Sequence, residues 1–210
     1  MNIVTLTRKC NLAKKMKPTK KQQLENTAKD LFWKHGFKKV TIEEICKKAN
    51  VSRKTFYTIY ENKNALVLFI LNETIENMKL ENMKVFESTI PFGEKMEIML
   101  DKKLKFSETI SLEFIADLYS PEVGEVKDYF QKFMKESVDF SREFFKLAQE
   151  KGEMNPNLKL DFVMWIIQKL GELCSMPELI AMFPDAESMT RQVSEYALYG
   201  IMPVKNSSNV

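Results

Sequence analysis

Apolar residues recur at three- and four-residue spacing along most of this chain, and this feature restricts its fold most strongly. Leu24, Ala28, Leu31 and Phe32 are one example. Such spacing places apolar side chains on one face of an α-helix. The chain has only 6 glycines and no alternating β-branched run long enough to predict a strand. We therefore predict an all-α fold of about nine helices.

Recognisable stop signals separate the expected helices. Gly36 can end the first helix in a left-handed conformation, and Pro177 and Pro184 separate the last two. The expected ranges are 19–35, 41–49, 53–60, 65–86, 96–104, 112–119, 126–151, 159–174 and 185–201. Residues 162–167 are apolar in succession, so their helix should be covered on nearly all sides.

Two short predicted helices meet at the turn 50–52. Thr41 can cap the first of them, with Glu44 reaching back as in a capping box. In the turn, Asn50 tolerates the left-handed conformation, and Ser52 is a good cap for the next helix. Helices with this spacing form a helix-turn-helix, which lays its second helix in the major groove of DNA.

The apolar residues of this helix pair should turn inward together. They are Ile42, Ile45, Cys46, Ala49, Val51 and Phe56. The residues left facing outward on the second helix are Arg53, Lys54, Thr55, Tyr57 and Thr58. Arginine can bind guanine through two hydrogen bonds, a threonine methyl can contact thymine, and tyrosine hydroxyls can hold phosphates.

The charge distribution is consistent with a DNA-binding end. Residues 1–63 contain 16 Lys and Arg against 5 Asp and Glu, whereas the remainder contains 16 against 24. A basic region on an acidic body favours contact with a polyanion at that end. Charge alone leaves a solvated lysine-rich face as the alternative.

The stretch TIEEICKKANVSRKTFYTIYENKNAL, residues 41–66, resembles the DNA-binding signature of the TetR family of regulators. ENTAKDLFWKHGFKKV, residues 25–40, is similar to the family's first helix. Two residues depart from the pattern: Cys46 stands where the family usually has Ala, and Asn50 where it usually has Gly.

The resemblance implies roles for individual residues. It implies phosphate contacts for Thr41, Tyr57, Tyr60 and Lys63, and base contacts for Arg53, Lys54 and Thr55. The full set of expected DNA-binding residues is Thr41, Ser52, Arg53, Lys54, Thr55, Tyr57, Thr58, Tyr60 and Lys63. The partner would be double-stranded DNA with a palindromic operator, because the family binds as a homodimer.

The expected domain organisation follows the motif. We expect a basic tail over 1–18, a DNA-binding domain over 19–64, an effector-binding and dimerisation domain over 65–202, and a tail over 203–210. Translation can start at Met1 or at Met16. In TetR-like proteins the last two helices form the dimer interface. The residues expected there are Ile166, Leu170, Met189, Val193, Ala197 and Gly200, with ordinary core as the alternative.

Residues 93–175 are rich in Phe and Met, which favours a pliable apolar cavity. The candidate lining residues are Phe114, Tyr119, Phe133 and Trp165, each of which could instead be ordinary core. The resemblance implies a repressor that a small apolar or amphipathic effector releases from DNA. The residues do not identify the effector.

An enzyme is the first alternative class, and few residues favour it. The single histidine, His35, lies at a predicted helix end, where a cation interacts well with the helix dipole. We expect no catalytic residues, no cofactor and no metal, because the chain has no Ser-His-Asp set, no Cys/His ligand spacing and no phosphate-binding glycine loop.

Two further alternatives share the amino-terminal motif. One is an effector-independent architectural DNA-binding protein, and the other is a thiol redox sensor that uses Cys46 or Cys174. The odd number of cysteines, 3, and the absence of an apolar run of membrane-spanning length predict a cytoplasmic protein without membrane contact.

Overall fold

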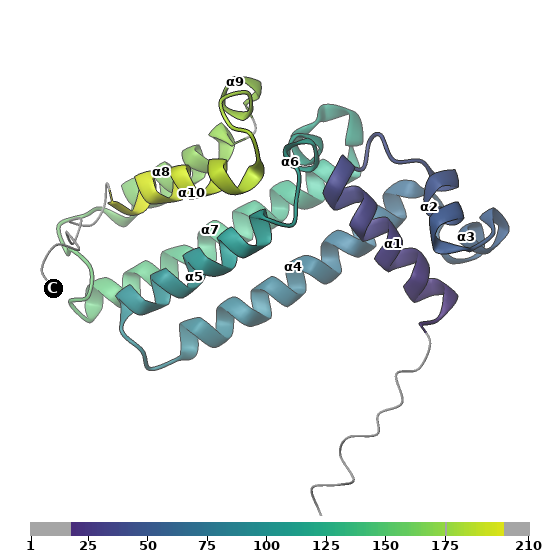
Figure 1. Ribbon diagram of the computed structural model, residues 1–210. Coiled ribbons are helices and arrows are strands. Elements are labelled where there is room, and N and C mark those ends of the chain that lie inside the picture. The colour runs from purple at the N-terminus through teal and green to yellow at the C-terminus, as the bar shows by residue number, and fades with distance from the viewer. Residues whose placement is uncertain (1–17, 175, 200–210) are drawn as a thin grey trace, which may run out of the picture.

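The computed structural model describes residues 18–174 and 176–199, and within these ranges every regular element is helical. The elements are α1 (Lys20–His35), α2 (Ile42–Ala49), α3 (Arg53–Ile59), α4 (Lys63–Glu87), α5 (Phe92–Ser107), α6 (Leu112–Tyr119), the 3₁₀ turn η2 (Pro121–Val123), α7 (Glu125–Glu150), α8 (Leu160–Leu173), α9 (Pro177–Ile180) and α10 (Ala186–Tyr199). The predicted all-α class is confirmed (Figure 1).

The nine predicted helices are all present, and a tenth lies between the last two. This helix, α9, has 4 residues and begins at Pro177, which is favourable at a first helical position. This segment was expected to be a connection, because proline is usually a helix stop. Also, α4 begins two residues early, since the Asn62 side chain accepts a hydrogen bond from the Ala65 amide at 2.9 Å.

Helices α1 to α3 form a small unit at one end of the molecule (Figure 1). Its centre is made of Leu24, Phe32, Ile45 and Phe56, each no more than 1 % exposed. Burying a side chain of this size contributes roughly 1.5–3 kcal/mol. The first turns of α4 supply Leu66 to the same cluster, so the expected boundary at residue 64 runs through a continuous helix.

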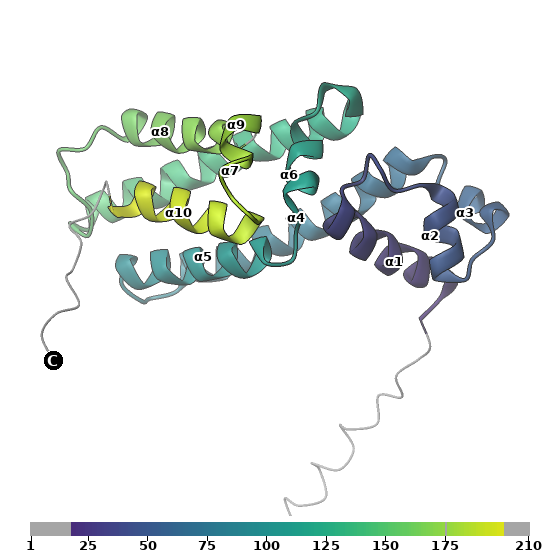
Figure 2. The ribbon, with the colours of Figure 1, turned by 45° about the horizontal axis from the view of Figure 1, so that its top comes forward.

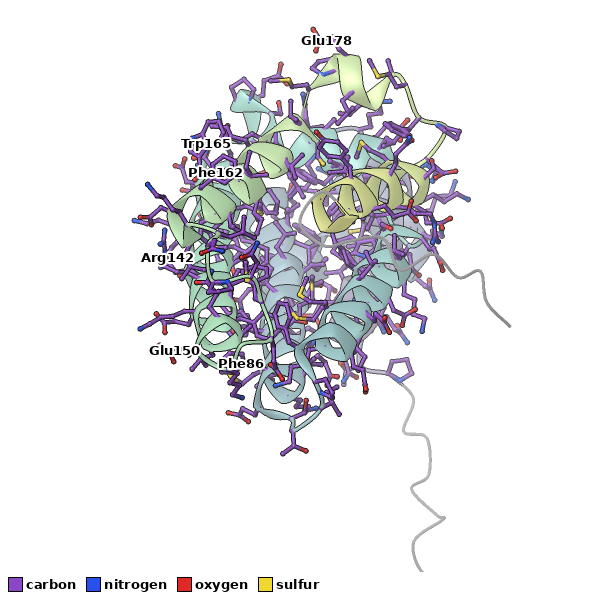
Figure 3. The ribbon with its side chains drawn as sticks, turned by 90° about the vertical axis from the view of Figure 1, so that its left-hand side faces the viewer. Phe86, Arg142, Glu150, Phe162, Trp165 and Glu178 are labelled. Atoms are coloured by element: carbon purple, nitrogen blue, oxygen red, sulfur yellow. The ribbon has the colours of Figure 1, made fainter. Side chains whose placement is uncertain are left out.

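Five helices form the larger unit, and each contacts the next around a closed ring. The order of contacts is α4, α5, α10, α8, α7 and back to α4. Figure 3 views this ring nearly along its axis, and Figure 2 shows α10 lying between α8 and α5. In the described part of the chain, no helix is both long enough and apolar enough to cross a membrane.

Helix α6 joins the two units. The Ser111 amide donates to the Trp33 carbonyl at 2.8 Å, and Asp117 Oδ2 accepts from the Lys38 amide at 2.8 Å. Phe114 packs on Trp33 with ring centroids 4.6 Å apart. The C-terminal end of α1 is therefore held by α6, which belongs to a segment some 80 residues further along the chain.

The apolar core is divided into two clusters. The first surrounds Phe32, Phe56 and Phe114 and extends to Val126 at the start of α7. The second, at the opposite end of the ring, surrounds Phe92, Phe144, Met154 and Met164.

Candidate nucleic-acid interface

The turn between α2 and α3 has the geometry that its residues predict. Asn50 adopts a left-handed conformation, with φ 52° and ψ 46°, and its amide donates to the carbonyls of Cys46 and Lys47. Ser52 caps α3 by accepting from the Thr55 amide at 3.0 Å. These contacts set the direction in which α3 leaves α2.

Thr41 caps α2, but its cap differs from the expected one. Its hydroxyl accepts from the Glu44 amide at 3.2 Å. The reciprocal capping box occurs at α1 instead, where Thr19 and Gln22 bond to each other's amides at 2.9 and 3.2 Å. Both caps satisfy amides that the first helical turn leaves unpaired.

The inward side of the helix pair matches its prediction. Ile45, Cys46, Ala49, Val51 and Phe56 are all less than 10 % exposed and belong to one cluster, and Ile42 packs against it while partly buried. Because these side chains turn inward, the opposite face of α3 is available to solvent.

That outward face carries most of the predicted DNA-binding side chains. Thr41, Ser52, Arg53, Lys54, Tyr57 and Thr58 are exposed. Thr55 is partly buried, and its hydroxyl lies 2.9 Å from that of Ser52, so it serves the cap as well. Arg53 pairs with Glu43 of α2 at 2.8 Å, and both side chains are 58 % exposed. Arg53 must leave this exposed pair before it can bind a base.

Tyr60 is an exception to the expected phosphate contacts. It is 8 % exposed, its ring packs on Phe56 and Phe69, and its hydroxyl donates to Glu25. Burial, followed by the hydrogen bond to Glu25, raises the pKa of the Tyr60 phenol. The expectation is corrected: the hydroxyl is used inside the protein because α1 brings a carboxylate over it.

Lys63 is the second exception. Its Nζ donates to the carbonyls of Lys38 and Val40, at 3.0 and 2.9 Å, and burial lowers the pKa of its ammonium. Lys63 therefore connects the α1–α2 segment to the start of α4, and two of its three ammonium donors are used within the protein. The exposed lysines nearest to α2 and α3, which the sequence analysis did not single out, are Lys39, Lys47 and Lys48.

The two cysteines in the described residues are free and have raised pKa values. Burial is the main cause at Cys46 and also at Cys174, where the charge of Lys103 opposes it. A reactive sensor thiol needs the opposite shift, a lowered pKa.

Cys10, Met16 and most of the tail expected over 1–18 lie outside the described residues, as does the tail over 203–210.

The four expected effector residues do not line one cavity. Phe114 is 2 % exposed and packs between α1 and α6, whereas Trp165 is 55 % exposed on the outer side of α8 (Figure 3). Tyr119 bridges two helices, since its hydroxyl donates to the Gly171 carbonyl at 3.3 Å. Phe133 borders a largely polar pocket of about 150 Å³ between α4 and α7.

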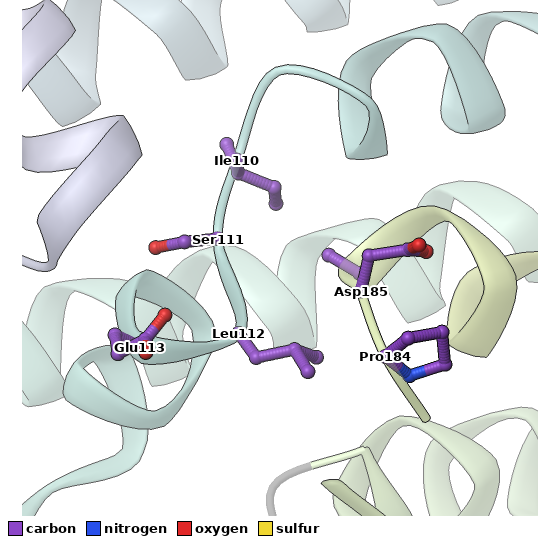
Figure 4. Close-up of a pocket in the computed structure, with 7 residues that line it drawn as sticks. Ile110, Ser111, Leu112, Glu113, Pro184 and Asp185 are labelled. Atoms are coloured by element: carbon purple, nitrogen blue, oxygen red, sulfur yellow. The ribbon is translucent and has the colours of Figure 1, made fainter.

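A second pocket, of about 200 Å³, lies where the segment before α6 faces the segment before α10. Figure 4 shows Ser111 and Leu112 on one side of it and Pro184 and Asp185 on the other. Cavities for drug-sized ligands are about 300–1,000 Å³ and mostly apolar. Neither pocket is the enclosed apolar cavity that the sequence analysis expected.

The expected dimer residues divide into two groups. Met189 is 1 % exposed and packs within its own chain, so it is not available to a partner. Ile166, Leu170, Val193 and Ala197 are partly buried, and Gly200 lies outside the described residues. The most exposed large apolar residues on α8 and α10 are Phe162 at 56 %, Trp165 at 55 % and Tyr196 at 75 %. Helix α8 is thus uncovered on one side, contrary to expectation.

Sequence comparison identifies a family and several relatives. Residues 26–70 match the model of the bacterial regulatory proteins of the tetR family. The uncharacterized HTH-type transcriptional regulator YhgD of Bacillus subtilis is 27 % identical over 139 residues, which are 65 % of this chain and 72 % of that protein. The probable acrEF/envCD operon repressor of Escherichia coli is 26 % identical over 164 residues, 70 % of each chain.

Solved structures share the fold. The transcriptional regulator FadR from Bacillus subtilis, in complex with stearoyl-CoA, has a TM-score of 0.63 and 16 % identity, over 86 % of this chain and 98 % of that one. A cysteine mutant of the TetR family transcriptional regulator CifR, complexed with 26bp double-strand operator DNA, has a TM-score of 0.65 and 15 % identity, over 86 % and 95 %.

The matched residues 26–70 contain the capped α2, the left-handed turn at Asn50 and the exposed face of α3. The fold of the remaining helices is shared with the regulators above. On these findings, residues 26–70 match the tetR family of bacterial regulatory proteins, and the described helices share the fold of TetR family regulators.

Proposed function

We propose that this protein is a transcriptional repressor that binds a palindromic operator as a homodimer and is released by a small-molecule effector. The exposed face of α3 carries this proposal. Arg53, Lys54 and Tyr57 project there from a helix whose start is capped by Ser52. A rigid helix with an exposed guanidinium can read bases, and neighbouring lysines can neutralise phosphates.

The proposed contacts follow the exposure of each side chain. Arg53, Lys54 and Thr55 would meet bases, and Thr41, Ser52, Tyr57 and Thr58 would meet the backbone. Lys39, Lys47 and Lys48 are added as phosphate contacts because they are exposed beside α2. Tyr60 and Lys63 would act indirectly, because their hydrogen bonds hold α1 and α4 in place beside α3. Because the proposed target is chromosomal DNA, the proposed place of action is the bacterial cytoplasm.

Dimerisation is proposed through the uncovered sides of α8 and α10. Phe162 and Trp165 lie one turn apart on α8 and project from the outer side of the ring (Figure 3). Exposed aromatic residues gathered in this way are typical of protein interfaces. In such a dimer the two α3 helices would lie one turn of DNA apart, about 34–36 Å, so that each would meet one half-site of a palindrome.

Binding of DNA is tested by fluorescence anisotropy. The purified protein is titrated into labelled DNA from the region upstream of its own gene, at several salt concentrations and against scrambled competitor. Preferred binding with a steep salt slope supports the proposal. If no DNA is preferred over the competitor, the proposed function is wrong.

Arg53→Ala tests the reading role of α3. We expect a loss of about 1–3 kcal/mol in specific binding, together with relaxed sequence choice. Arg191→Ala is the matched control, because Arg191 forms a similar exposed pair with Glu187 at 2.5 Å on α10. An equal loss on specific and scrambled DNA would contradict base reading by Arg53.

A further inference from the structure

Glu43 of α2 forms an ion pair with Arg53 of α3, the residue proposed to read bases. Helices α2 and α3 lie in contact at one end of the molecule (Figures 1 and 2). The Glu43 carboxylate lies 2.8 Å from Arg53 Nη1, and each of the two side chains is 58 % exposed. The first turn of α2 therefore contributes a negative charge to the face on which Arg53 is proposed to meet DNA.

The surface around this pair is otherwise basic. Helix α3 contains no carboxylate, and Lys47, Lys48 and Lys54 are all exposed. An exposed ion pair adds little to the stability of a folded protein. A carboxylate on a surface that meets DNA also repels the phosphates. The stability of the single chain therefore does not account for the pairing of Glu43 with Arg53.

The helix dipole gives carboxylates a general role at this position, but it does not distinguish Glu43 from its neighbour. Glu43 and Glu44 both lie in the first turn of α2, where a negative charge interacts favourably with the unpaired amides. Both are exposed. Within the described residues, the ion pair of Arg53 is with Glu43 and not with Glu44. Glu44 is therefore the natural comparison for Glu43.

Phosphates and Glu43 compete for the same guanidinium. Both offer anionic oxygens, which are strong acceptors for arginine. If Arg53 turns to a phosphate, the Glu43 carboxylate loses its partner close to the DNA backbone, where charges about 10 Å apart still interact in dilute salt. Since the backbone is the same in every sequence, this repulsion opposes binding to any DNA.

The edge of a G·C pair offers a different exchange. Guanine presents the neutral acceptors N7 and O6 to arginine, and cytosine presents its N4 amino group, from which a carboxylate can accept. When Arg53 binds a guanine, Glu43 can accept from a cytosine beside it. Adenine fits a carboxylate less well, because its N7 acceptor lies next to its amino group. The loss of the ion pair is therefore compensated only on a suitable sequence.

We propose that Glu43 is a specificity-determining residue of the DNA interface: its carboxylate retains Arg53 where only phosphates are offered, and it accepts from a cytosine N4 amino group where Arg53 binds a neighbouring guanine. This proposal rests on the DNA-binding function proposed above and adds a residue that limits binding to unrelated sequences.

The base that Glu43 reads is tested by selection from a randomised double-stranded DNA library, followed by sequencing. The parent should select a guanine that Arg53→Ala no longer selects, with a cytosine beside it. In Glu43→Gln the preference for this cytosine should fall roughly tenfold and shift towards adenine, whose N6 and N7 suit glutamine. An unchanged preference for the cytosine in Glu43→Gln would overturn the proposal.

Binding to scrambled DNA tests the competition with phosphates. Without the carboxylate, Arg53 is free to contact a phosphate, so Glu43→Gln should bind scrambled DNA more tightly than the parent. The slope of the logarithm of affinity against the logarithm of salt concentration should steepen by about one. In an Arg53→Ala background, Glu43→Gln should leave this slope unchanged. No steepening in the single variant, or equal steepening without Arg53, would contradict the proposal.

Glu44→Gln is the matched control, because it removes a carboxylate from the same turn of α2. The two glutamine variants should lose equal, small amounts of thermal stability, since both weaken the interaction with the helix dipole. Glu44→Gln should nevertheless select the sequence of the parent and keep its salt slope. If both variants change the selected sequence and the slope alike, the stability of α2 explains the effect and the proposal is wrong.

The two proposals fail in different ways. If the parent selects a sequence and Glu43→Gln selects the same sequence equally well, the role of Glu43 is wrong and the regulator remains. If the parent selects no sequence from the library and prefers no DNA over competitor, the DNA-binding function itself is wrong, and the role of Glu43 fails with it.

Discussion

At the scale of single residues, the contacts that shape the DNA-binding unit come from side chains that do not face DNA. Lys63 donates to two backbone carbonyls in the α1–α2 connection, and Tyr60 donates to Glu25 of α1. Gly36 lies at φ 74°, and a Cβ there would be 2.6 Å from Asp117 Oδ2, which is held by the Lys38 amide. Each of these residues fixes the position of α1 or of its connection to α2.

Gly36→Ala should reduce the free energy of unfolding by about 1–3 kcal/mol, because the backbone there favours glycine and the added Cβ meets Asp117. The measurement is urea denaturation followed by circular dichroism. Gly93→Ala is the matched control, since nothing lies within 4 Å of its Cβ position and its φ is not positive. Equal stabilities of the two variants would refute this explanation of Gly36.

Lys63→Met should lower the free energy of unfolding by about 1–3 kcal/mol, because two carbonyls lose a charged donor. The slope of the logarithm of DNA affinity against the logarithm of salt concentration should stay unchanged in this variant. Lys48→Met, at an exposed lysine proposed as a phosphate contact, should reduce that slope by about one without loss of stability. The reverse pattern would restore Lys63 as a phosphate contact.

At the scale of elements, α3 is short and depends on its start. It has 7 residues, and a helix of this length is not stable in isolation. The Ser52 hydroxyl satisfies the Thr55 amide and also contacts the Thr55 hydroxyl, while Phe56 anchors the opposite side in the core. Helix α3 is therefore held in place by the Ser52 cap and by the buried ring of Phe56.

Ser52→Ala should cost about 0.5–2 kcal/mol of stability through loss of the cap, and DNA affinity should fall with it because α3 frays at the end that meets DNA. Asp185→Ala is the control: Asp185 Oδ1 accepts from the Ser188 amide at 2.7 Å, at the start of α10. We expect a similar stability loss there with unchanged affinity for DNA, measured by anisotropy. A comparable loss of affinity in both variants would show that α3 responds only to global stability.

At the scale of the whole molecule, two units are joined through α4 and α6, and the outer side of α8 remains uncovered in the single chain. The contacts of α6 with the end of α1 mean that a movement of α6 would also move the DNA-binding unit. Helix α6 also ends at Tyr119, whose hydroxyl donates to the Gly171 carbonyl of α8. Helix α6 therefore connects α8 with the end of α1 through direct contacts.

Trp165→Glu should convert a dimer to a monomer in sedimentation-velocity experiments at micromolar concentration, because it places a charge in the proposed interface. Met182→Glu is the control, since Met182 is 72 % exposed and lies outside α8 and α10. On dilution of the parent, the emission of Trp165 should shift to longer wavelength, whereas buried Trp33 should contribute a constant background. A monomeric parent protein, or a dimeric Trp165→Glu variant, would contradict this interface.

Local chemistry in the sequence was sufficient to predict the turn and every described helix except α9. Caps, stops and apolar spacing act over a few residues, so Asn50, Ser52 and the buried face of α2 could be predicted without knowing their distant neighbours. The basic amino-terminal region and the family pattern in 41–66 are also properties of the chain itself. The prediction missed α9 because Pro177 serves equally as a stop and as a first helical residue.

Tertiary structure decided which side chains are free to act. The Tyr60 hydroxyl donates to Glu25, which lies 35 residues earlier in the chain. Met189 is buried within its own chain, although its spacing suited an interface. Lys103 receives its hydrogen bond partner from a residue 91 positions later. Burial and desolvation depend on elements that meet only after folding, so periodicity can place a side chain on a helix face but does not tell what covers that face.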